Sequence, residues 1–277
     1  MSLNNKPVAL ITGASSGFGM RTAERLHTQG WIVYAAARRV ERMATLSQRG
    51  IRTLAMDVSS EKSIKEGVKT ILQEEGRIDA LLNNAGFGSY GGVEDVPIET
   101  IHYQFDVNLF GAARVIRAVL PTMRKQNSGR IVNTASVVAH ISTAGIGWYA
   151  ATKHALSAMT DALRQELSGT GIYVSQIEPG VVRTGFEEVA ITTLKAVHHQ
   201  KEYQDVMDGV ADGTRRMYKN APGPESTVKA MVHALTAKKP KSVYKTTWDS
   251  RWLPLVRRLI GGKLYDKISL RTMRKSA

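Results

Sequence analysis

Hydrophobic residues in the first two thirds of the chain gather in short runs that are separated by longer amphipathic stretches. The short runs are rich in β-branched and aliphatic side chains and lie at residues 8–12, 31–37, 52–58, 78–83, 130–135 and 172–177. Between them, helical spacing is seen at residues 19–29, 40–50, 60–75, 97–126 and 148–168. This alternation predicts an α/β fold of the Rossmann type, a doubly wound parallel sheet of about seven strands with helices on both faces.

Glycine and serine mark several of the predicted helix ends. Gly30 and Gly50 stand just past the first two helices, where a left-handed backbone costs glycine least. Ser60 directly precedes Glu61 and is a candidate N-cap for the third helix.

The pattern changes after Gly180. Residues 183–223 are polar, charged and without strand-like alternation, which predicts a mobile helical insertion beside the substrate. A helix at 225–237 and a short strand at 242–246 complete the predicted sheet. We therefore expect one dinucleotide-binding and catalytic domain over residues 1–247, with a C-terminal extension over residues 248–277.

Positive charge is concentrated toward the C-terminus. The formal net charge is +14, and residues 181–277 hold 19 Lys or Arg against 9 Asp or Glu, a net of +10. In the extension, apolar residues repeat at helical spacing with arginines between them: Trp252, Leu255, Val256, Leu259 and Ile260. Such a basic amphipathic helix suits a lid, a subunit interface or an anionic membrane surface, and membrane contact is not the favoured choice. No helix-turn-helix, zinc finger or RNA-binding signature accompanies the charge, so no nucleic-acid partner is expected.

Other features of the composition narrow the class of protein. The chain has no cysteine, which excludes disulfides and thiolate metal sites and fits a reducing compartment. No apolar run is long enough to cross a bilayer, and the first residues lack the pattern of a signal peptide, so we expect a cytoplasmic protein. The histidines show no zinc-ligand spacing beside a carboxylate, and no metal site is predicted.

A glycine-rich turn lies between the first predicted strand and its helix. It comprises Thr12, Gly13, Ala14, Ser15, Ser16, Gly17, Phe18 and Gly19. Glycines let the backbone approach a pyrophosphate, and the helix N-terminus adds free N–H groups and partial positive charge. Because a tight turn alone also needs glycines, this motif indicates a nucleotide site only in combination with others along the chain.

Four more motifs occur in order along the chain. Asn84-Ala85-Gly86 comes after the fourth predicted strand, and Ser136 ends the fifth. Tyr149 and Lys153 open the next helix, and Pro179-Gly180 closes the sixth strand. Together with the glycine turn, this series resembles the short-chain dehydrogenase/reductase family, in its subgroup of about this length with the motifs TGxxxGxG and YxxxK.

The resemblance implies an oxidoreductase that moves a hydride between a nicotinamide cofactor and a carbonyl or secondary alcohol. The nearest relatives in character are hydroxysteroid, retinol and acyl-dihydroxyacetone-phosphate reductases, which implies a lipophilic small-molecule substrate. Members of the family often form homodimers or homotetramers, and the same is expected here. A non-catalytic NADP(H)-binding sensor or interaction protein remains the alternative.

Tyr149 and Lys153 are four residues apart and share one face of the predicted helix. A free tyrosine has a pKa near 10, but an adjacent ammonium and an oxidised nicotinamide both favour the phenolate. The two residues are therefore a candidate proton-transfer pair. Without the other motifs, the same spacing would indicate only an ordinary amphipathic helix.

The resemblance also implies roles for single residues. Ser136 would hydrogen-bond the substrate oxygen, Asn108 would position a water that links Lys153 to solvent, and Lys153 would also hold the ribose hydroxyls. The implied cofactor contacts, besides Tyr149 and Lys153, are Gly13, Ser15, Ser16, Gly17, Phe18, Gly19, Asp57, Val58, Asn84, Ala85, Gly86, Pro179, Gly180, Val182 and Thr184.

The end of the second predicted strand bears on the choice of cofactor. An acidic residue there would hydrogen-bond the adenosine ribose of NAD, whereas this chain has Arg38 and Arg39. A guanidinium suits a 2′-phosphate through charge-assisted hydrogen bonds. The sequence thus favours NADP(H) over NAD(H), although both arginines could instead be solvated or paired with Glu41.

Overall fold

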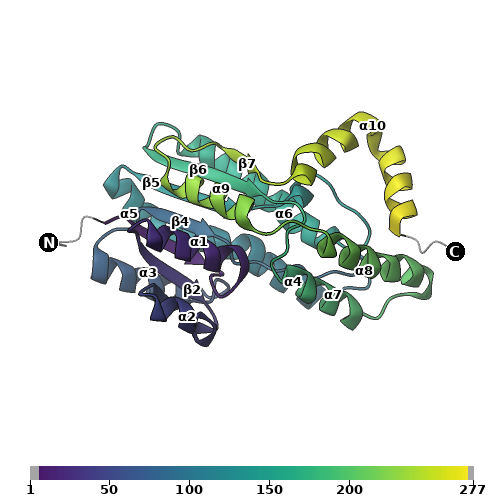
Figure 1. Ribbon diagram of the computed structural model, residues 1–277, viewed down its shortest axis with the longest axis horizontal. Coiled ribbons are helices and arrows are strands. Elements are labelled where there is room, and N and C mark those ends of the chain that lie inside the picture. Colours follow the sequence, from purple (N-terminus) through teal and green to yellow (C-terminus); the bar gives the residue numbers. More distant parts are fainter. Residues whose placement is uncertain (1–5, 274–277) are drawn as a thin grey trace.

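The computed structural model describes residues 6–273 and contains one seven-stranded parallel sheet (Figure 1). Its strands are β1 (Val8–Thr12), β2 (Ile32–Ala37), β3 (Arg52–Ala55), β4 (Ala80–Asn83), β5 (Gly129–Thr134), β6 (Ile172–Glu178) and β7 (Val243–Lys245). They are ordered β3-β2-β1-β4-β5-β6-β7, and every adjacent pair is parallel. The sheet reverses its direction of growth between β1 and β4, which is where α/β sheets of this kind bind ligands. The predicted Rossmann-type fold is confirmed.

Helices cover both faces of the sheet. One face carries α1 (Gly17–Thr28), α2 (Ala44–Gln48) and α9 (Glu225–Thr236), and the other carries α3 (Glu61–Glu75), α5 (Ala112–Gln126) and α6 (Gly147–Glu166). Two apolar cores result, one between each helical layer and the sheet. Central strands are buried on both sides, which explains why β1 is a continuous apolar run rather than an alternating one.

The predicted helix ends agree with the structure. Gly30 and Gly50 adopt φ angles of 85° and 83°, in the left-handed region that favours glycine. Ser60 caps α3, because its hydroxyl accepts a hydrogen bond from the Ser63 N–H.

Three predicted elements were wrong in detail. The helix expected at 97–126 is divided into α4 (Ile98–Phe105), a π-helical segment η2 (Asp106–Gly111) and α5. The stretch at 40–50 is a 3₁₀ turn, η1 (Val40–Met43), with the short helix α2 after it. Finally, β3 ends at Ala55 instead of residue 58, because the Asp57 side chain accepts a hydrogen bond from the Ser59 N–H and turns the chain away from the sheet.

The last third of the chain adds helices at the carboxyl end of the sheet (Figure 1). The insertion predicted at 183–223 is helical, with α7 (Phe186–Ala196), η4 (Lys201–Tyr203) and α8 (Gln204–Lys219); its mobility stays a prediction. The last helix, α10 (Trp248–Met273), bends at Gly261, whose φ of 75° and ψ of 166° are not helical. Its second half turns back onto α8, where a Cβ at Gly209 would lie only 1.3 Å from the Met273 carbonyl oxygen. No helix in the described part of the chain is long and apolar enough to span a membrane.

Candidate active site

A cavity of about 1100 Å³ opens at the carboxyl ends of the strands and extends from β2 to α8 and α10. It brings together nearly all the site residues that the sequence suggests. Those that line it are Gly13, Ser15, Ser16, Gly17, Phe18, Arg38, Arg39, Asp57, Val58, Asn84, Ala85, Gly86, Ser136, Tyr149, Lys153, Pro179, Gly180, Val182 and Thr184. Gly19 and Asn108 are not part of the lining and act from behind it.

The glycine turn is fixed by close backbone contacts. Gly13 and Gly17 have φ angles of 64° and 55°, which other residues adopt only with strain. A Cβ at Gly13 would lie 2.7 Å from the Ala85 Cα, and one at Gly19 would lie 2.6 Å from the Gly13 carbonyl oxygen. Gly19 therefore lets α1 pack against its own turn, while Gly13 and Gly17 shape the cavity wall.

The start of α1 has the donors that a phosphate needs. Its N-cap residue, Ser16, makes no side-chain hydrogen bond to the helix, so the N–H groups of the first turn are not capped by it. The Asn84 side chain donates to the carbonyl oxygens of Thr12 and Gly13 at 3.3 and 3.0 Å and holds the turn open toward these N–H groups. With Arg38 and Arg39 further along the same cavity, the donors fit the phosphates of a dinucleotide.

Tyr149 and Lys153 lie one turn apart near the start of α6, and both are almost fully buried. The Lys153 Nζ is 5.8 Å from the centre of the Tyr149 ring and donates to the Thr134 carbonyl oxygen at 2.8 Å. This hydrogen bond fixes the ammonium at the end of β5, between the tyrosine and the cofactor side of the cavity.

Burial shifts both groups toward their neutral forms. Desolvation raises the pKa of Tyr149, the neighbouring Tyr90 adds to that rise, and a hydrogen bond with Ser136 opposes it. Desolvation also lowers the pKa of Lys153 from 10.5 to about 8. Burial therefore opposes ionisation of the phenol. The expectation that an adjacent ammonium and an oxidised nicotinamide both favour the phenolate stays a prediction.

Ser136 sits where β5 ends. Its hydroxyl bonds the Tyr149 phenol, lies 3.4 Å from the Pro179 carbonyl oxygen and accepts from the Val138 N–H at 3.3 Å. The side chain is thus held at the cavity wall, next to the phenol.

Asn108 lies in the π-helical segment η2, behind the wall. Its side-chain oxygen accepts from the Phe87 N–H at 3.0 Å, and its nitrogen donates to the Phe87 carbonyl oxygen and the Thr152 hydroxyl at 2.8 and 3.1 Å. These contacts join the loop after β4 to α6. The side-chain oxygen and nitrogen of Asn108 are therefore already hydrogen-bonded within the protein. Any role in holding a water would fall to other atoms of this region.

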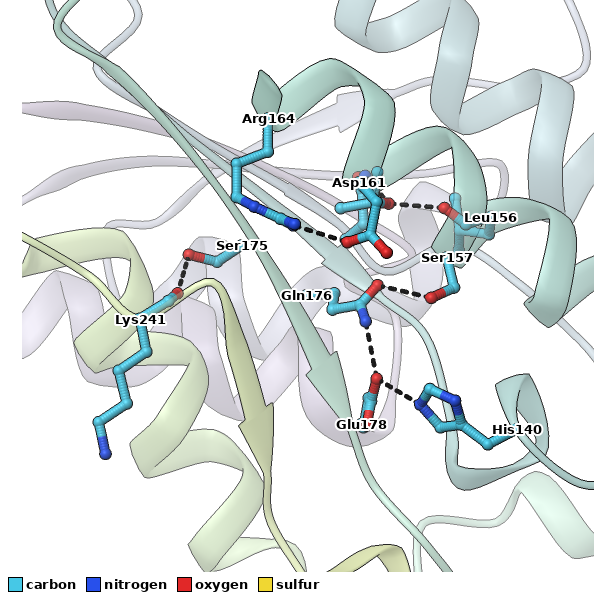
Figure 2. Close-up of polar contacts among 11 residues, drawn as sticks. His140, Leu156, Ser157, Asp161, Arg164, Ser175, Gln176, Glu178 and Lys241 are labelled. Carbon is cyan, nitrogen blue, oxygen red and sulfur yellow. Dashed lines mark hydrogen bonds and ion pairs between the residues drawn. The ribbon is translucent and has the colours of Figure 1, made fainter. Parts of the chain in front are cut away.

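A buried polar network anchors the loop that carries Ser136. Figure 2 shows Glu178, at the end of β6, between His140 and Gln176. One carboxylate oxygen accepts from the His140 Nε2 at 2.8 Å and from the Gln176 Nε2 at 2.7 Å, and Gln176 in turn accepts from Ser157 of α6 at 3.1 Å. Ser136, the end of β6 and α6 are thereby tied together. His140 belongs to this support and is not among the residues lining the cavity.

The sequence did not point to the residues that fix the loop after β6. The Thr247 hydroxyl accepts from the Gly180 N–H at 2.9 Å, and the Asp249 carboxylate accepts from the Val181 N–H at 2.8 Å. A Cβ at Gly180 would collide with that carboxylate, so any other residue there would displace the Asp249 side chain. Thr247 and Asp249 come after β7, where no motif marks them.

A second group that the sequence did not identify forms the apolar end of the cavity. Its members come from the loop after β4 and from α7, α8 and α10: Tyr90, Phe186, Val189, Val210, Met217, Leu253, Tyr265, Ile268 and Met273. The rings of Tyr90 and Phe186 lie 6.0 and 5.4 Å from that of Tyr149. His199 hydrogen-bonds Asp95 at 2.9 Å and the Leu194 carbonyl oxygen at 3.0 Å, so it holds the end of α7 against the loop that carries Tyr90.

Known proteins share this sequence and arrangement. A family model for short chain dehydrogenases matches residues 7–194. The oxidoreductase YbbO of Escherichia coli, itself uncharacterized, is 36% identical over 260 residues, covering 94% of this chain and 92% of that protein. A 3-ketodihydrosphingosine reductase of Bacteroides thetaiotaomicron is 38% identical over 181 residues, covering 65% of this chain and 66% of that enzyme.

Solved structures agree with the sequence relatives. A short chain dehydrogenase/reductase of Burkholderia phymatum in complex with NAD superposes with a TM-score of 0.80 at 26% identity, over 94% of this chain and 95% of that one. An actinorhodin polyketide ketoreductase with NADPH gives 0.76 at 27% identity, over 90% and 99%.

The fold and the residues that line the cavity define a nucleotide-dependent oxidoreductase. More particularly, the chain belongs to the short-chain dehydrogenase/reductase family. Since the similar structures include complexes with NAD and with NADPH, they leave the choice of cofactor to the residues of this chain.

Proposed function

We propose that this protein is an NADP(H)-dependent reductase of lipophilic carbonyl compounds. The observation that carries the proposal is the position of the Tyr149 phenol, which lies where the polar, glycine-lined part of the cavity meets its apolar part. When bound, the nicotinamide cofactor supplies the hydride that the reaction transfers to carbon.

Tyr149 and the side chains around it supply the proton, the hydrogen bond and the positive charge that the reaction needs. Tyr149 donates its proton to the carbonyl oxygen as the alcohol forms, and Ser136 donates a hydrogen bond to the same oxygen. The positive charge of Lys153, held by the Thr134 carbonyl oxygen, stabilises the phenolate that remains. Asn108 acts as a positioning residue through its bonds to Phe87 and Thr152.

The two directions of the reaction use different states of the phenol. A protonated phenol donates the proton when a carbonyl is reduced, whereas alcohol oxidation begins with the phenolate. Burial raises the pKa of Tyr149, so the protein groups hold the phenol in its proton-donating form near pH 7.

The preference for NADP(H) rests on Arg38 and Arg39. Both line the end of the cavity next to β2, and no carboxylate lies at the end of that strand. The Arg38 guanidinium also hydrogen-bonds the Tyr103 hydroxyl, which orients it along the cavity wall. Its remaining donors suit the 2′-phosphate of NADP(H).

The lipophilic substrate class rests on the side chains beyond Tyr149. That end of the cavity is lined chiefly by aromatic and aliphatic groups from α7, α8 and α10, which gain from contact with an apolar ligand. A relative whose match covers 65% of the chain is named as a 3-ketodihydrosphingosine reductase, which supports the same class.

A screen of carbonyl compounds tests this function. We expect NADPH oxidation with long aliphatic, aromatic or steroid carbonyls, and far weaker oxidation with sugars of similar reactivity. NADPH binding without turnover of any of these classes would instead favour the non-catalytic sensor. Preference for the sugars would contradict the lipophilic assignment while leaving the enzyme assignment intact.

We also propose a homodimer or homotetramer. Apolar side chains exposed on α4 and η2, Ile98 and Phe110, support a subunit contact on that side of the molecule. A light-scattering mass equal to that of one chain would contradict it.

A further inference from the structure

The first half of α10 exposes an apolar stripe to solvent. Its residues succeed one another at short helical intervals and so share one broad side of the helix: Trp248, Trp252, Leu255, Val256 and Leu259. Trp248 is 73% exposed and Leu259 is 84% exposed. On the opposite side, Ser250 is fully buried and Leu253 lines the cavity. The helix therefore directs its larger apolar stripe outward, the reverse of a helix that packs on a core.

Cations flank this stripe and continue beyond the bend at Gly261. The described part of α10 has six of them, Arg251, Arg257, Arg258, Lys263, Lys267 and Arg271, against two carboxylates, Asp249 and Asp266. Asp249 is directed inward to the Val181 N–H, so it does not offset the outward charge. Arg257 points toward the His140 carbonyl oxygen at 3.4 Å, while Arg251 and Arg258 stand along one edge of the apolar stripe.

We propose that the outer face of α10 docks this protein on an anionic lipid bilayer. An interfacial helix needs an apolar stripe that enters the acyl boundary and cations beside it that meet the headgroups, and α10 presents both on its solvent side. The exposed Trp248 and Trp252 suit the headgroup region, where indole rings are enriched.

Charge and apolar surface together distinguish an anionic bilayer from other possible partners of this face. A second copy of this face would bring its Arg251 and Arg258 against the same two cations of the first copy, so self-association through this face is opposed by repulsion. Nucleic acid would satisfy the cations but would leave the apolar stripe without a partner. An anionic bilayer satisfies both features at once.

The inner side of α10 links docking to the entry of substrate into the cavity. Leu253, Tyr265 and Ile268 of α10 line the apolar end of the cavity, and Ile268 is also half exposed. Docking would place the rim of the cavity at the lipid surface, so that a lipophilic carbonyl passes from the bilayer into the cavity. This second part rests on the proposed function, whereas the docking itself does not.

Vesicle binding tests the docking without substrate or cofactor. The full chain is sedimented with vesicles of phosphatidylcholine alone, or of phosphatidylcholine with about a quarter phosphatidylglycerol, at low and high salt. We expect binding to the anionic vesicles, weaker binding at high salt and little binding to the neutral ones. Tryptophan emission should shift to the blue on binding, because two of the four tryptophans are Trp248 and Trp252.

Paired variants distinguish vesicle binding through the apolar stripe from nonspecific binding. The double variant Trp252→Glu/Leu259→Glu should abolish vesicle binding, whereas Val93→Glu, which alters an exposed apolar residue in the loop after β4, should not. Replacing Arg251 and Arg258 with Gln should weaken binding about twenty-five-fold, since each cation near an anionic surface contributes about a factor of five. The matched pair Lys62→Gln/Lys69→Gln on α3 should bind as the wild type does. Unchanged NADPH binding shows that each variant is folded.

Three results would overturn the proposal. They are no sedimentation with anionic vesicles, equal binding by the Arg251/Arg258 variant and the wild type, and a dimer in solution that the stripe variant converts to a monomer. The last result would assign the stripe to a second copy of the chain. Reduction of a water-soluble carbonyl in the absence of vesicles is measured alongside, so that a failure of docking is distinguished from a failure of the proposed function.

Discussion

The two ends of the cavity are built in different ways. The cofactor end is formed by backbone at the carboxyl ends of central strands, where Gly13 and Gly17 are required by close contacts or positive φ angles. The apolar end is formed by side chains of α7, α8 and α10, and polar contacts such as His199 with Asp95 join the end of α7 to the loop after β4. The cofactor end can therefore hold the chemistry that is common to a family. The apolar end can differ from member to member without changing that chemistry.

Tyr149→Phe tests the junction between the two ends and should have the largest effect. The variant loses the proton donor but keeps the buried ring, so turnover should fall about a thousandfold while NADPH affinity stays nearly unchanged. Steady-state rates and a fluorescence titration with NADPH measure the two quantities. Tyr173→Phe, which alters a tyrosine on β6, is the control, and wild-type turnover in the Tyr149 variant would remove the assignment.

Arg38→Asp tests the cofactor end alone. A charge-assisted hydrogen bond contributes about 1.5 to 3 kcal/mol, so one contact to the 2′-phosphate predicts a preference of roughly ten- to a hundredfold for NADPH over NADH. The variant should reverse the preference by repelling the phosphate and accepting from the ribose hydroxyl. The ratio of kcat/KM for the two cofactors measures it, with Arg42→Asp as control. Equal use of both cofactors by the wild type would contradict the prediction.

Lys153→Met tests the desolvation of the buried lysine through the pH dependence of the free energy of unfolding. Because the folded pKa of about 8 lies below the unfolded value of 10.5, the unfolded state binds more protons between these pH values, and wild-type stability should rise across that window. The Met variant lacks this rise, so the difference in free energy of unfolding between the two proteins should change by up to about 3 kcal/mol from pH 8 to 10.5. Loss of the bond to Thr134 shifts the difference by a constant only.

Urea denaturation of both proteins at several pH values measures that difference. Lys229→Met, which alters an exposed lysine on α9, should show no comparable change. A pH-independent difference for the Lys153 variant would show that the lysine is not desolvated as described.

Asp249→Ala tests whether the C-terminal segment supports the cofactor end, and it should have the smallest effect. Loss of the acceptor for the Val181 N–H should weaken NADPH binding about fivefold, the value of one ordinary hydrogen bond. The same titration measures it, and Asp266→Ala, an exposed carboxylate on the same helix, is the control. If the two variants bind alike, the bond between Asp249 and the Val181 N–H does not support the cofactor end.

Local signals in the sequence predicted the sheet and the caps at Gly30 and Ser60, and the family resemblance suggested the residues that line the cofactor end of the cavity. These features depend on residues close in the chain or on the shared edge of parallel strands. The sequence did not predict contacts between distant segments, such as Arg38 with Tyr103 or Asp249 with Val181. The π-helical segment at Asn108 was missed for the same reason, because its side chain bonds Phe87 and Thr152 from other elements.

Transfer of deuterium tests the central claim, that Tyr149 lies at the junction where a hydride passes to a lipophilic carbonyl. Wild-type protein and Tyr149→Phe are incubated with NADPH carrying deuterium at the transferable position and a long-chain carbonyl that the screen identifies. Mass spectrometry of the alcohol measures the label. We predict an alcohol with one deuterium from the wild type and almost none from the variant, although both proteins bind NADPH. NADPH binding by the wild type with no labelled alcohol from any carbonyl class would contradict the account.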